Sequence, residues 1–289
     1  MSASSLHAQR LVAGYGERTI LNDVNLSVPG GHTTAIVGAN ACGKSTLLRV
    51  LSRLLLPTQG SVMLDGDAIH QLPTRRLAQQ LGFLPQSPIA PEGISVLELV
   101  SRGRHPHQGL FKRWSTADEA AVADALAATH MSELAECHVD ELSGGQRQRV
   151  WIAMALAQQT KVLLLDEPTT FLDINHQVEV LDLLTDLNRE RGTTIVMVLH
   201  ELNLAARYAD QLVAMANGKV YSVGPPEEIL TEQMVRDVFG LESRVIEDPV
   251  TGKPMMIPLG RHGGRYPAKD IKSPKANAPN VGKHRAFDR

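Results

Sequence analysis

The chain has 289 residues, of which 43% are hydrophobic and 21% are charged, proportions that are ordinary for a globular protein with a substantial core. No apolar run reaches about eighteen residues and Met1 to His7 lack a signal-peptide layout, so the sequence predicts neither a membrane span nor export. The two cysteines, Cys42 and Cys137, are too few for a disulfide framework. We expect both to be reduced thiols in the cytoplasm.

The formal net charge of −2 is unevenly distributed along the chain. Residues 261–289 carry eight Lys or Arg against two Asp, a net charge of +6, so the first 260 residues sum to −8. Beyond Gly260 the apolar residues thin out and Gly, Pro, Lys and Asn dominate, which is typical of disorder. We expect residues 261–289 to be a disordered basic tail, with weak attraction to anionic lipid as the alternative.

The first predicted elements are a sheet, a loop and a helix. Alternating apolar residues over 5–28 predict an antiparallel sheet, and residues 33–37 have the pattern of a short buried strand. A helix is expected from Lys44 to about Ser52. A buried strand that leads through a glycine-containing loop into a helix is the usual setting of a phosphate site.

Gly38, Gly43, Lys44 and Ser45 in that loop satisfy the pattern G-x-x-x-x-G-K-[ST]. Small residues let successive backbone N–H groups converge on phosphate oxygens, and the helix dipole favours the same anion. Lys44 is predicted to reach the β- and γ-phosphates, and Ser45 to offer its hydroxyl to Mg²⁺. The loop therefore predicts a nucleotide site. Its other predicted nucleotide contacts are Ala39, Asn40, Ala41, Cys42 and Thr46.

The middle of the chain changes from mixed elements to helices alone. Residues 61–66 and 81–86 have the pattern of strands, and a short basic helix opened by Pro73 lies between them. Over residues 95–158 the strand signals vanish, which predicts an all-helical insert. Its helices are expected to begin at the N-cap Ser95, to span 117–129 and to span 146–158.

Strands and helices alternate again after the insert, which predicts an α/β fold with a parallel sheet. Residues 161–167 hold an apolar run that suits a strand buried on both faces. The later elements are expected to be a helix over 175–189, a strand over 194–199 ending at His200, a helix over 202–208, two strands flanking the Asn217-Gly218 turn, and helices over 226–230 and 232–239.

Two carboxylates, Asp166 and Glu167, end the strand over 161–167. A parallel sheet brings Asp166 beside the phosphate loop at the carboxyl edge of the strands, where we expect it to hold Mg²⁺ directly or through water. Glu167 is then the candidate to orient or deprotonate the attacking water. Leu142–Gln146, with two glycines and Ser143 before a helix, predicts a second anion-binding turn, although one triphosphate does not need two.

Three motifs carry a family resemblance. Gly38–Thr46, Leu142–Gln146 and Val162–Glu167, in this order, resemble the Walker A, signature and Walker B motifs of ABC-type ATPases. The resemblance runs from about residue 5 to about residue 260 and implies an α/β P-loop NTPase fold, with a RecA-like core, an N-terminal antiparallel β subdomain and an inserted all-helical subdomain. The expected division is 5–88 and 160–240 for the core, 89–159 for the helical subdomain and 241–260 for a C-terminal extension.

The resemblance also implies roles for single residues. Gln86 falls on the family's Q-loop glutamine, which contacts ATP and, with Ser45 and Asp166, Mg²⁺. Tyr15 falls on the aromatic that stacks on adenine, and His200 on the switch histidine. The implied catalytic residues are Glu167, His200 and Lys44. In this family two copies pair head to tail, so the ATP on one phosphate loop also meets the partner's signature and D-loop residues, here Ser143, Gly144, Gly145, Gln146 and Asp173.

A more particular similarity points to a transport partner. Arg102–Gln108, Pro168–Gln177 and Val198–Asn203 resemble the ATPase subunits of bacterial ferric-siderophore importers, the enterobactin type most of all. This implies separate transmembrane permease subunits, indirectly a siderophore-binding protein, and a peripheral position on the cytoplasmic face of the bacterial cell membrane. His105 and His107 would then face the permease from the helical insert and would not bind metal.

Two loop residues depart from the family's pattern. Ala39 and Ala41 occupy positions where Pro and Gly are common in the family. Because Ala41 carries a Cβ, we expect a slightly altered loop with nucleotide binding retained.

Other functions stay open. An importer of haem or cobalamin shares these motifs, because the cargo does not contact this subunit. A soluble ABC-type ATPase acting on DNA or ribosomes is the alternative from another class, but the sequence has no sustained heptads and only one cassette, so no nucleic-acid partner is expected. A regulatory nucleotide binder without turnover is disfavoured because Glu167 and His200 are both present.

Overall fold

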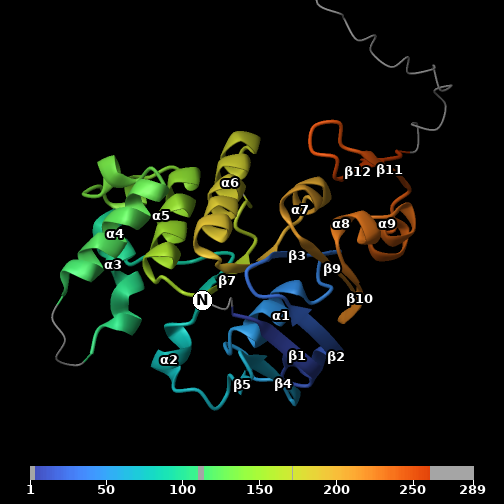
Figure 1. Ribbon diagram of the computed structural model, residues 1–289, viewed down its shortest axis with the longest axis horizontal. Coiled ribbons are helices and arrows are strands. Elements are labelled where there is room, and N and C mark those ends of the chain that lie inside the picture. Colours follow the sequence, from blue (N-terminus) through green and yellow to red (C-terminus); the bar gives the residue numbers. More distant parts are fainter. Residues whose placement is uncertain (1–3, 110–113, 171, 261–289) are drawn as a thin grey trace, which may run out of the picture. The chain divides into compact units, whose positions relative to one another are not determined.

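The main sheet has six strands, and their order decides which chain ends meet. The structure is a computed structural model that describes residues 4–109, 114–170 and 172–260. The strands are β3 (Thr33–Gly38), β6 (Leu81–Leu84), β7 (Val162–Asp166), β8 (Thr194–Val198), β9 (Gln211–Ala216) and β10 (Lys219–Gly224). They are ordered β10-β9-β3-β8-β7-β6, all parallel except for β10, which returns antiparallel to β9 (Figure 1). The carboxyl ends of β3, β6, β7 and β8 therefore share one edge.

The central strands of this sheet are buried on both faces, as their uninterrupted apolar sequences predict. In β3, Ala35 and Val37 belong to one apolar cluster and Ile36 belongs to the other. β7 and β8 alternate between the same two clusters. Residues that follow these strands are thus attached to a rigid support.

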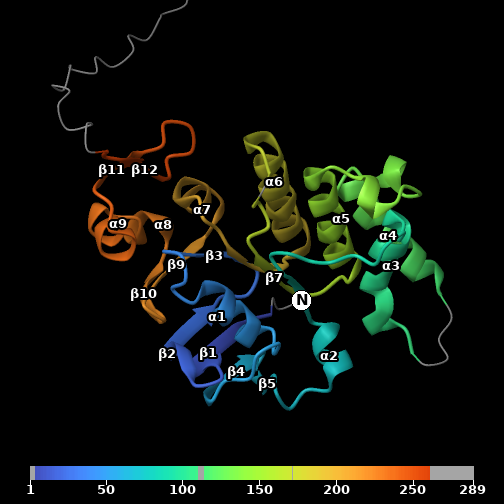
Figure 2. The ribbon, with the colours of Figure 1, turned by 180° about the vertical axis from the view of Figure 1, so that it is seen from behind.

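A second sheet and the first helix cover one face of the main sheet. This sheet has the order β2-β1-β4-β5 and is antiparallel throughout. Helix α1 (Lys44–Leu51) packs between the two sheets, because Leu47 and Leu48 share an apolar cluster with Leu11 of the second sheet and Val196 of β8 (Figures 1 and 2). The strands are β1 (Leu6–Tyr15), β2 (Arg18–Val28), β4 (Gln59–Leu64) and β5 (Asp67–Ala68).

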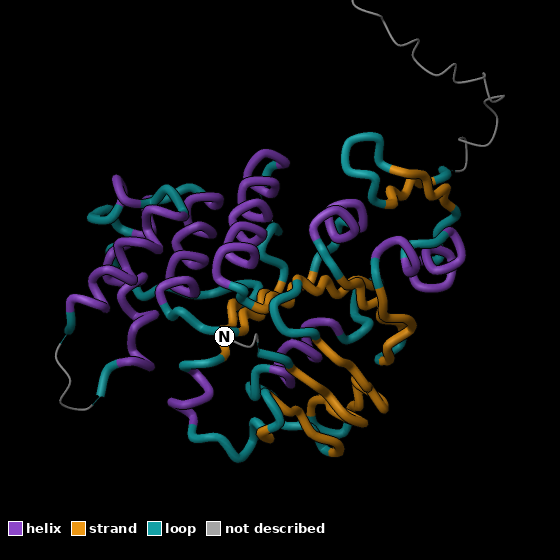
Figure 3. The backbone as a smooth tube through the Cα atoms, viewed as in Figure 1, coloured by secondary structure: helices purple, strands orange, loops and turns teal. Residues whose placement is uncertain are grey.

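The described residues between positions 96 and 157 contain helices and loops but no strand, as predicted (Figure 3). The helices are α3 (Val96–Ser101), the 3₁₀ helix η1 (Arg102–His107), α4 (Thr116–Ala128), the 3₁₀ helices η2 (Ser132–Leu134) and η3 (Val139–Glu141), and α5 (Gly144–Ala157). Ser95, Ser115 and Ser143 begin α3, α4 and α5 with capping boxes, in which the serine hydroxyl accepts a hydrogen bond from the third residue of the helix. We call residues 96–157 the helical region.

The remaining helices flank the main sheet, and a hairpin follows them. The helices are α2 (Thr74–Ala78), α6 (Ile174–Arg191), α7 (Leu202–Tyr208), α8 (Pro226–Ile229) and α9 (Glu232–Phe239). The hairpin pairs β11 (Ser243–Glu247) with β12 (Pro254–Pro258) and was not predicted as strands. Asn203 of α7 holds it, because its amide accepts from the Met256 N–H at 2.7 Å and donates to the Met256 carbonyl at 3.1 Å.

This is the α/β architecture, with an antiparallel β region and a helical region, that the sequence predicts. Among the described residues, no helix combines the length and the apolar character needed to cross a membrane. The residue boundaries assigned to the subdomains stay a prediction. The predicted disorder of residues 261–289 lies outside the described residues.

Candidate functional site

The phosphate loop joins β3 to α1 as predicted, and Lys44 folds back across it. The Lys44 ammonium donates to the carbonyls of Gly38 at 2.8 Å and Ala39 at 3.1 Å, and the side chain is almost wholly buried. Ala41 has φ +61°, in the left-handed region that costs an L-residue roughly 1 kcal/mol. The loop therefore keeps a glycine-like conformation at a position occupied by alanine.

The predicted metal-binding pair lies together at the loop. The Ser45 hydroxyl donates to Asp166 Oδ1 at 2.9 Å, which connects the first turn of α1 with the carboxyl end of β7. Burial raises the pKa of the Asp166 carboxyl, the charge of Glu167 adds to this, and the hydrogen bond from Ser45 opposes it. A buried carboxylate beside a hydroxyl forms a site that a bound cation would stabilise.

Glu167 is held by side chains from three neighbouring strand ends. Gln86 Nε2, after β6, donates to Glu167 Oε2 at 2.5 Å, and His200 Nε2, after β8, lies 2.5 Å from Glu167 Oε1. The Thr170 hydroxyl donates to Oε2 at 3.1 Å. Glu167 itself has φ +55° and is 8% exposed. A non-glycine residue in this conformation at a buried carboxylate is typical of functional sites.

Thr170 was missed by the sequence analysis, although its place three residues after Glu167 suits a turn that returns to the same carboxylate. A cleft of about 490 Å³ lies over the phosphate loop. It is lined by Tyr15, Arg18, Ile20, Asn40, Ala41, Gly43, Lys44, Ser45, Thr46, Gln86, Glu167 and His200. Arg18 and Ile20 were also missed, because only the pairing of β1 with β2 brings them to this place.

Two predicted loop residues take particular positions around this cleft. Tyr15 is 46% exposed and its hydroxyl accepts a hydrogen bond from Arg49 Nη1 at 3.0 Å, so the residue is accessible to a nucleotide base. The Cys42 side chain is instead packed in the apolar cluster beneath the loop. Burial raises the pKa of the Cys42 thiol, and the nearby Lys44 charge opposes this. Cys42 is thus left with its backbone as a means to contact nucleotide.

The signature turn does not line this cleft within the single chain. Ser143 is exposed; its Oγ accepts from the Gln146 N–H at 3.3 Å, and its own N–H donates to Gln146 Oε1 at 2.9 Å. Gly144 is also exposed and Gly145 is half-buried. Asp173 is exposed as well and caps α6 by accepting from the His176 N–H at 3.0 Å. The signature turn and Asp173 are therefore separate from the phosphate-loop cleft in the single chain.

His105 and His107 of the helical region lie in different surroundings. His105 is exposed, but His107 is half-buried and its Nε2 lies 2.7 Å from the carbonyl of Gln158. The end of α5 offers the His107 ring an unsatisfied carbonyl, and the orientation of His107 toward a partner stays a prediction. The described residues contain no group of three or more His, Cys, Asp or Glu arranged to hold a metal ion.

The comparison with known proteins agrees with this geometry. Residues 21–170 match a family model described as ABC transporter. The chain belongs to the ABC transporter family. It is an ATP-binding ATPase subunit of that family, and the resemblance drawn from its motifs is confirmed together with the P-loop NTPase fold.

The chain matches individual relatives over nearly the whole of their length. The petrobactin import ATP-binding protein FpuD of Bacillus anthracis is 53% identical over 92% of this chain and 97% of its own. The ferric enterobactin transport ATP-binding protein FepC of Escherichia coli is 51% identical over 90% of this chain and 96% of its own. The dimeric structure of MJ0796, a bacterial ABC transporter cassette, has a TM-score of 0.69 and 29% identity, covering 76% of this chain and 98% of that one.

Proposed function

We propose that this chain hydrolyses ATP to energise the import of ferric siderophores through a separate transmembrane permease. The observation that carries the ATPase part is the carboxylate of Glu167, held by Gln86 and His200 at the mouth of the phosphate-loop cleft. The cargo class rests on the relatives, whose names describe petrobactin and ferric enterobactin transport.

The phosphate loop supplies the charge for binding ATP. Lys44 is the proposed ligand of the β- and γ-phosphates, and its contacts with the Gly38 and Ala39 carbonyls leave one of its three N–H donors for them. The donor set suits Mg²⁺, because Ser45 Oγ and Asp166 Oδ1 are hard oxygen atoms 2.9 Å apart. Ser45, Asp166 and Gln86 are the residues we assign to that ion, which neutralises phosphate charge when bound. Tyr15 is assigned to the adenine.

Glu167 is assigned to the attacking water. Its buried carboxylate accepts hydrogen bonds from Gln86 and Thr170, so its orientation is fixed before the nucleotide arrives. His200, at the end of β8, contacts the other carboxylate oxygen and is assigned a catalytic role beside it. Phosphoryl transfer asks the protein mainly for positioning and charge stabilisation, which this arrangement provides.

We assign the signature turn and Asp173 to the nucleotide of a second copy of this chain, so that the phosphate loop and the signature turn are two half-sites. Ser143, Gly144 and Asp173 are all exposed, and none of them lines the chain's own cleft. The MJ0796 cassette forms a dimer, which makes a head-to-tail pair the natural way to join the two halves. ATP bound to both halves favours closure through its higher affinity for the closed state, and hydrolysis releases it.

The helical region offers a surface for the permease. A groove of about 650 Å³ lies between α3 and α4, and Leu97 and Trp114 on its wall are 37% and 46% exposed. Its apolar lining includes Val122 and Leu126. We assign this groove, in the helical subdomain 89–159, to the permease, with the chain peripheral on the cytoplasmic face of the membrane. A siderophore-binding protein would take part only indirectly, through the permease.

The test is the substitution Glu167→Gln. It is expected to lower ATP turnover by about 10²–10⁴-fold, because a positioned base is lost, and to leave an ATP-bound dimer detectable by sedimentation. Glu201→Gln is the matched control, because Glu201 is exposed and its side chain makes no cap contact with α7. It should turn over normally. A Glu167→Gln protein that stays monomeric at saturating Mg-ATP and hydrolyses at the normal rate would contradict the proposal.

The cargo is tested separately. Vesicles carrying the chain with its copurifying membrane subunits should take up a radiolabelled ferric siderophore in an ATP-dependent way, and not haem or cobalamin. Uptake of haem or cobalamin alone would leave the ATPase assignment in place and replace the cargo.

A further inference from the structure

The segment Arg102–His107, which we call the clip, has two differently occupied sides. Arg102 and His105 are exposed and line the groove between α3 and α4. Gly103 and Arg104 are buried, and a Cβ on Gly103 would meet the Met154 carbonyl of α5 at 2.3 Å. The clip therefore runs in close contact with the carboxyl-terminal half of α5.

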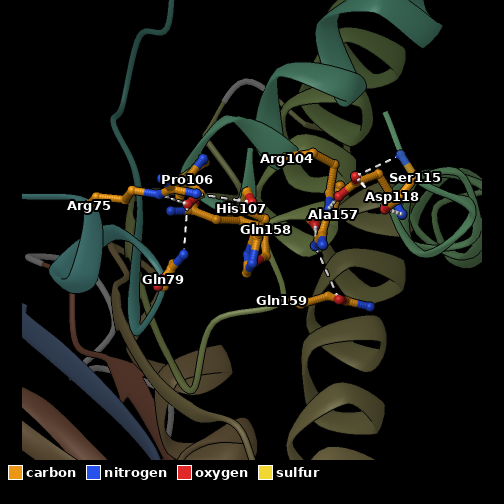
Figure 4. Close-up of polar contacts among 10 residues, drawn as sticks. All are labelled: Arg75, Gln79, Arg104, Pro106, His107, Ser115, Asp118, Ala157, Gln158 and Gln159. Atoms are coloured by element: carbon orange, nitrogen blue, oxygen red, sulfur yellow. Dashed lines mark hydrogen bonds and ion pairs between the residues drawn. The ribbon is translucent and has the colours of Figure 1, made fainter. Parts of the chain in front are cut away.

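Arg104 joins two helices of the helical region through one buried cation (Figure 4). Its Nε donates to Asp118 Oδ1 in α4 at 2.9 Å, and its Nη1 donates to the Ala157 carbonyl of α5 at 2.7 Å. The side chains of Arg104 and Asp118 are 6% and 3% exposed. The Ser115 hydroxyl donates to Asp118 Oδ2 at 2.6 Å. The last carbonyls of a helix lack partners in the helix and attract cations, so Arg104 fixes the C-terminus (the rear end) of α5.

The same clip is bound to α2, which leads directly into β6 and Gln86. Arg75 Nε and Gln79 Nε2 each donate to the Pro106 carbonyl at 2.8 Å (Figure 4). Gln158 Nε2, just beyond α5, donates to the Ala78 carbonyl at 2.6 Å. The rear end of α5 is thus tied both to the helical region and to the segment that carries Gln86.

The signature turn lies at the N-terminus of α5, so the attachment of the C-terminus of α5 decides where that turn lies. The helix has 14 residues and is about 21 Å long. A tilt of about 5° about its rear end would move Ser143 by about 2 Å, several times the range of distances that a hydrogen bond tolerates. Loosening the attachment is therefore expected to misplace Ser143 while leaving the helix intact.

We propose that Arg104 is a positioning residue for ATP-driven dimer closure: it holds α5 so that Ser143 meets the nucleotide bound by the partner copy. This rests on the proposed function, since it assumes the head-to-tail dimer. No residue of the clip lines the phosphate-loop cleft of the same chain, so we expect Arg104→Lys to leave the chain's own affinity for ATP nearly unchanged.

The experiment measures dimerisation of Glu167→Gln variants at saturating Mg-ATP by sedimentation velocity. Arg104→Lys keeps the charge beside Asp118 but lacks the fork that also reaches Ala157. It is expected to raise the protein concentration at half-dimerisation at least about tenfold. Mg-ATP affinity of the monomer, measured far below that concentration, should change less than about twofold, which separates positioning from a general structural loss.

The control is Met131→Ala in the same background, because Met131 is 1% exposed in the helical region and takes no part in the polar contacts of the clip. At a temperature where every variant is folded by circular dichroism, it should leave the midpoint of dimerisation unchanged. Equal midpoints with and without Arg104→Lys, or an equal shift caused by Met131→Ala, would overturn the inference alone. No ATP-dependent dimer in Glu167→Gln itself would overturn the proposed function as well.

His107→Ala provides a second variant, because it removes the contact with the Gln158 carbonyl without leaving a buried charge. It is expected to raise the midpoint in the same direction by a smaller factor. If Arg104→Lys does not fold, this comparison decides, and an unchanged midpoint overturns the inference.

Discussion

Gly218→Ala tests whether the turn between β9 and β10 braces the phosphate loop. The Gly218 N–H donates to the Cys42 carbonyl at 3.0 Å, and its carbonyl accepts from the Asn22 N–H at 2.9 Å. Gly218 has φ +73°, and a Cβ there would lie 2.0 Å from the Ile20 carbonyl oxygen. Because real contacts of this kind stay beyond 3 Å, the turn must move by about 1 Å and weaken both hydrogen bonds.

The expected loss follows from these contacts. A left-handed alanine costs about 1 kcal/mol, and two backbone hydrogen bonds contribute about 0.5–1.5 kcal/mol each, so the free energy of unfolding should fall by about 2–4 kcal/mol. At about 2–4 °C per kcal/mol, the melting temperature falls by about 5–15 °C. Nucleotide affinity should fall too, since Cys42 belongs to the phosphate loop.

Gly66→Ala is the matched control for this substitution. Asp65 and Gly66 form the same kind of turn as Asn217 and Gly218, with both residues at positive φ, but a Cβ on Gly66 meets nothing within 4 Å. It should cost only about 1 kcal/mol for the left-handed alanine and leave nucleotide affinity unchanged. Thermal melts and a fluorescent-nucleotide titration give both readouts. If Gly218→Ala loses no more stability than Gly66→Ala, the bracing argument is refuted.

Two further predictions concern single side chains. Tyr15→Ala should weaken nucleotide binding about 5–10-fold in the same titration while Tyr15→Phe, which also loses the Arg49 contact, stays near wild type; equal losses would exclude stacking. The Ser115 hydroxyl, followed by Arg104, lowers the pKa of Asp118 from 3.8 to about 2, so this carboxylate stabilises the fold above about pH 4 and that contribution is lost as pH falls toward 2. In urea titrations at several pH values, Asp118→Asn should remove the fall of the unfolding free energy between about pH 4 and pH 2. An unchanged fall in the variant would contradict this role of Asp118.

Elements whose signal is local were predicted closely. The apolar run of β7 and the short helices α7 and α9 depend on neighbours in sequence, and the predicted ranges 202–208 and 232–239 agree with the structure. The hairpin of β11 and β12 was not predicted, because β12 begins and ends with proline and is held by the Asn203 amide from α7, 53 residues away from Met256. A contact with one distant side chain produces no hydrophobic periodicity from which a strand could be predicted.

The same distinction divides the candidate site. Ser45, Asp166 and Glu167 were found because a motif and the carboxyl-edge rule for parallel sheets place them together. Arg49 was missed, because its contact with Tyr15 depends on how α1 packs under the antiparallel sheet. The contact of His107 was missed, because the Gln158 carbonyl that it meets lies 51 residues away.

Each of the two proposed half-sites keeps a hydrogen-bond donor for phosphate, the Lys44 ammonium in the phosphate loop and the Ser143 hydroxyl in the signature turn. The capping contact of Ser143 uses the hydroxyl oxygen as acceptor, so its O–H hydrogen is still able to donate. Lys44 has three N–H donors, and the Gly38 and Ala39 carbonyls take two of them. Both groups are therefore ordered by the chain before ATP arrives, and the conformational entropy of ordering them is already lost in the folded monomer. In the proposed head-to-tail pair, the free energy of contact with the phosphates is then available to hold two copies together. The proposed role of Arg104 follows, because the tightness of closure would depend on the position of α5 as well as on the chemistry of Ser143.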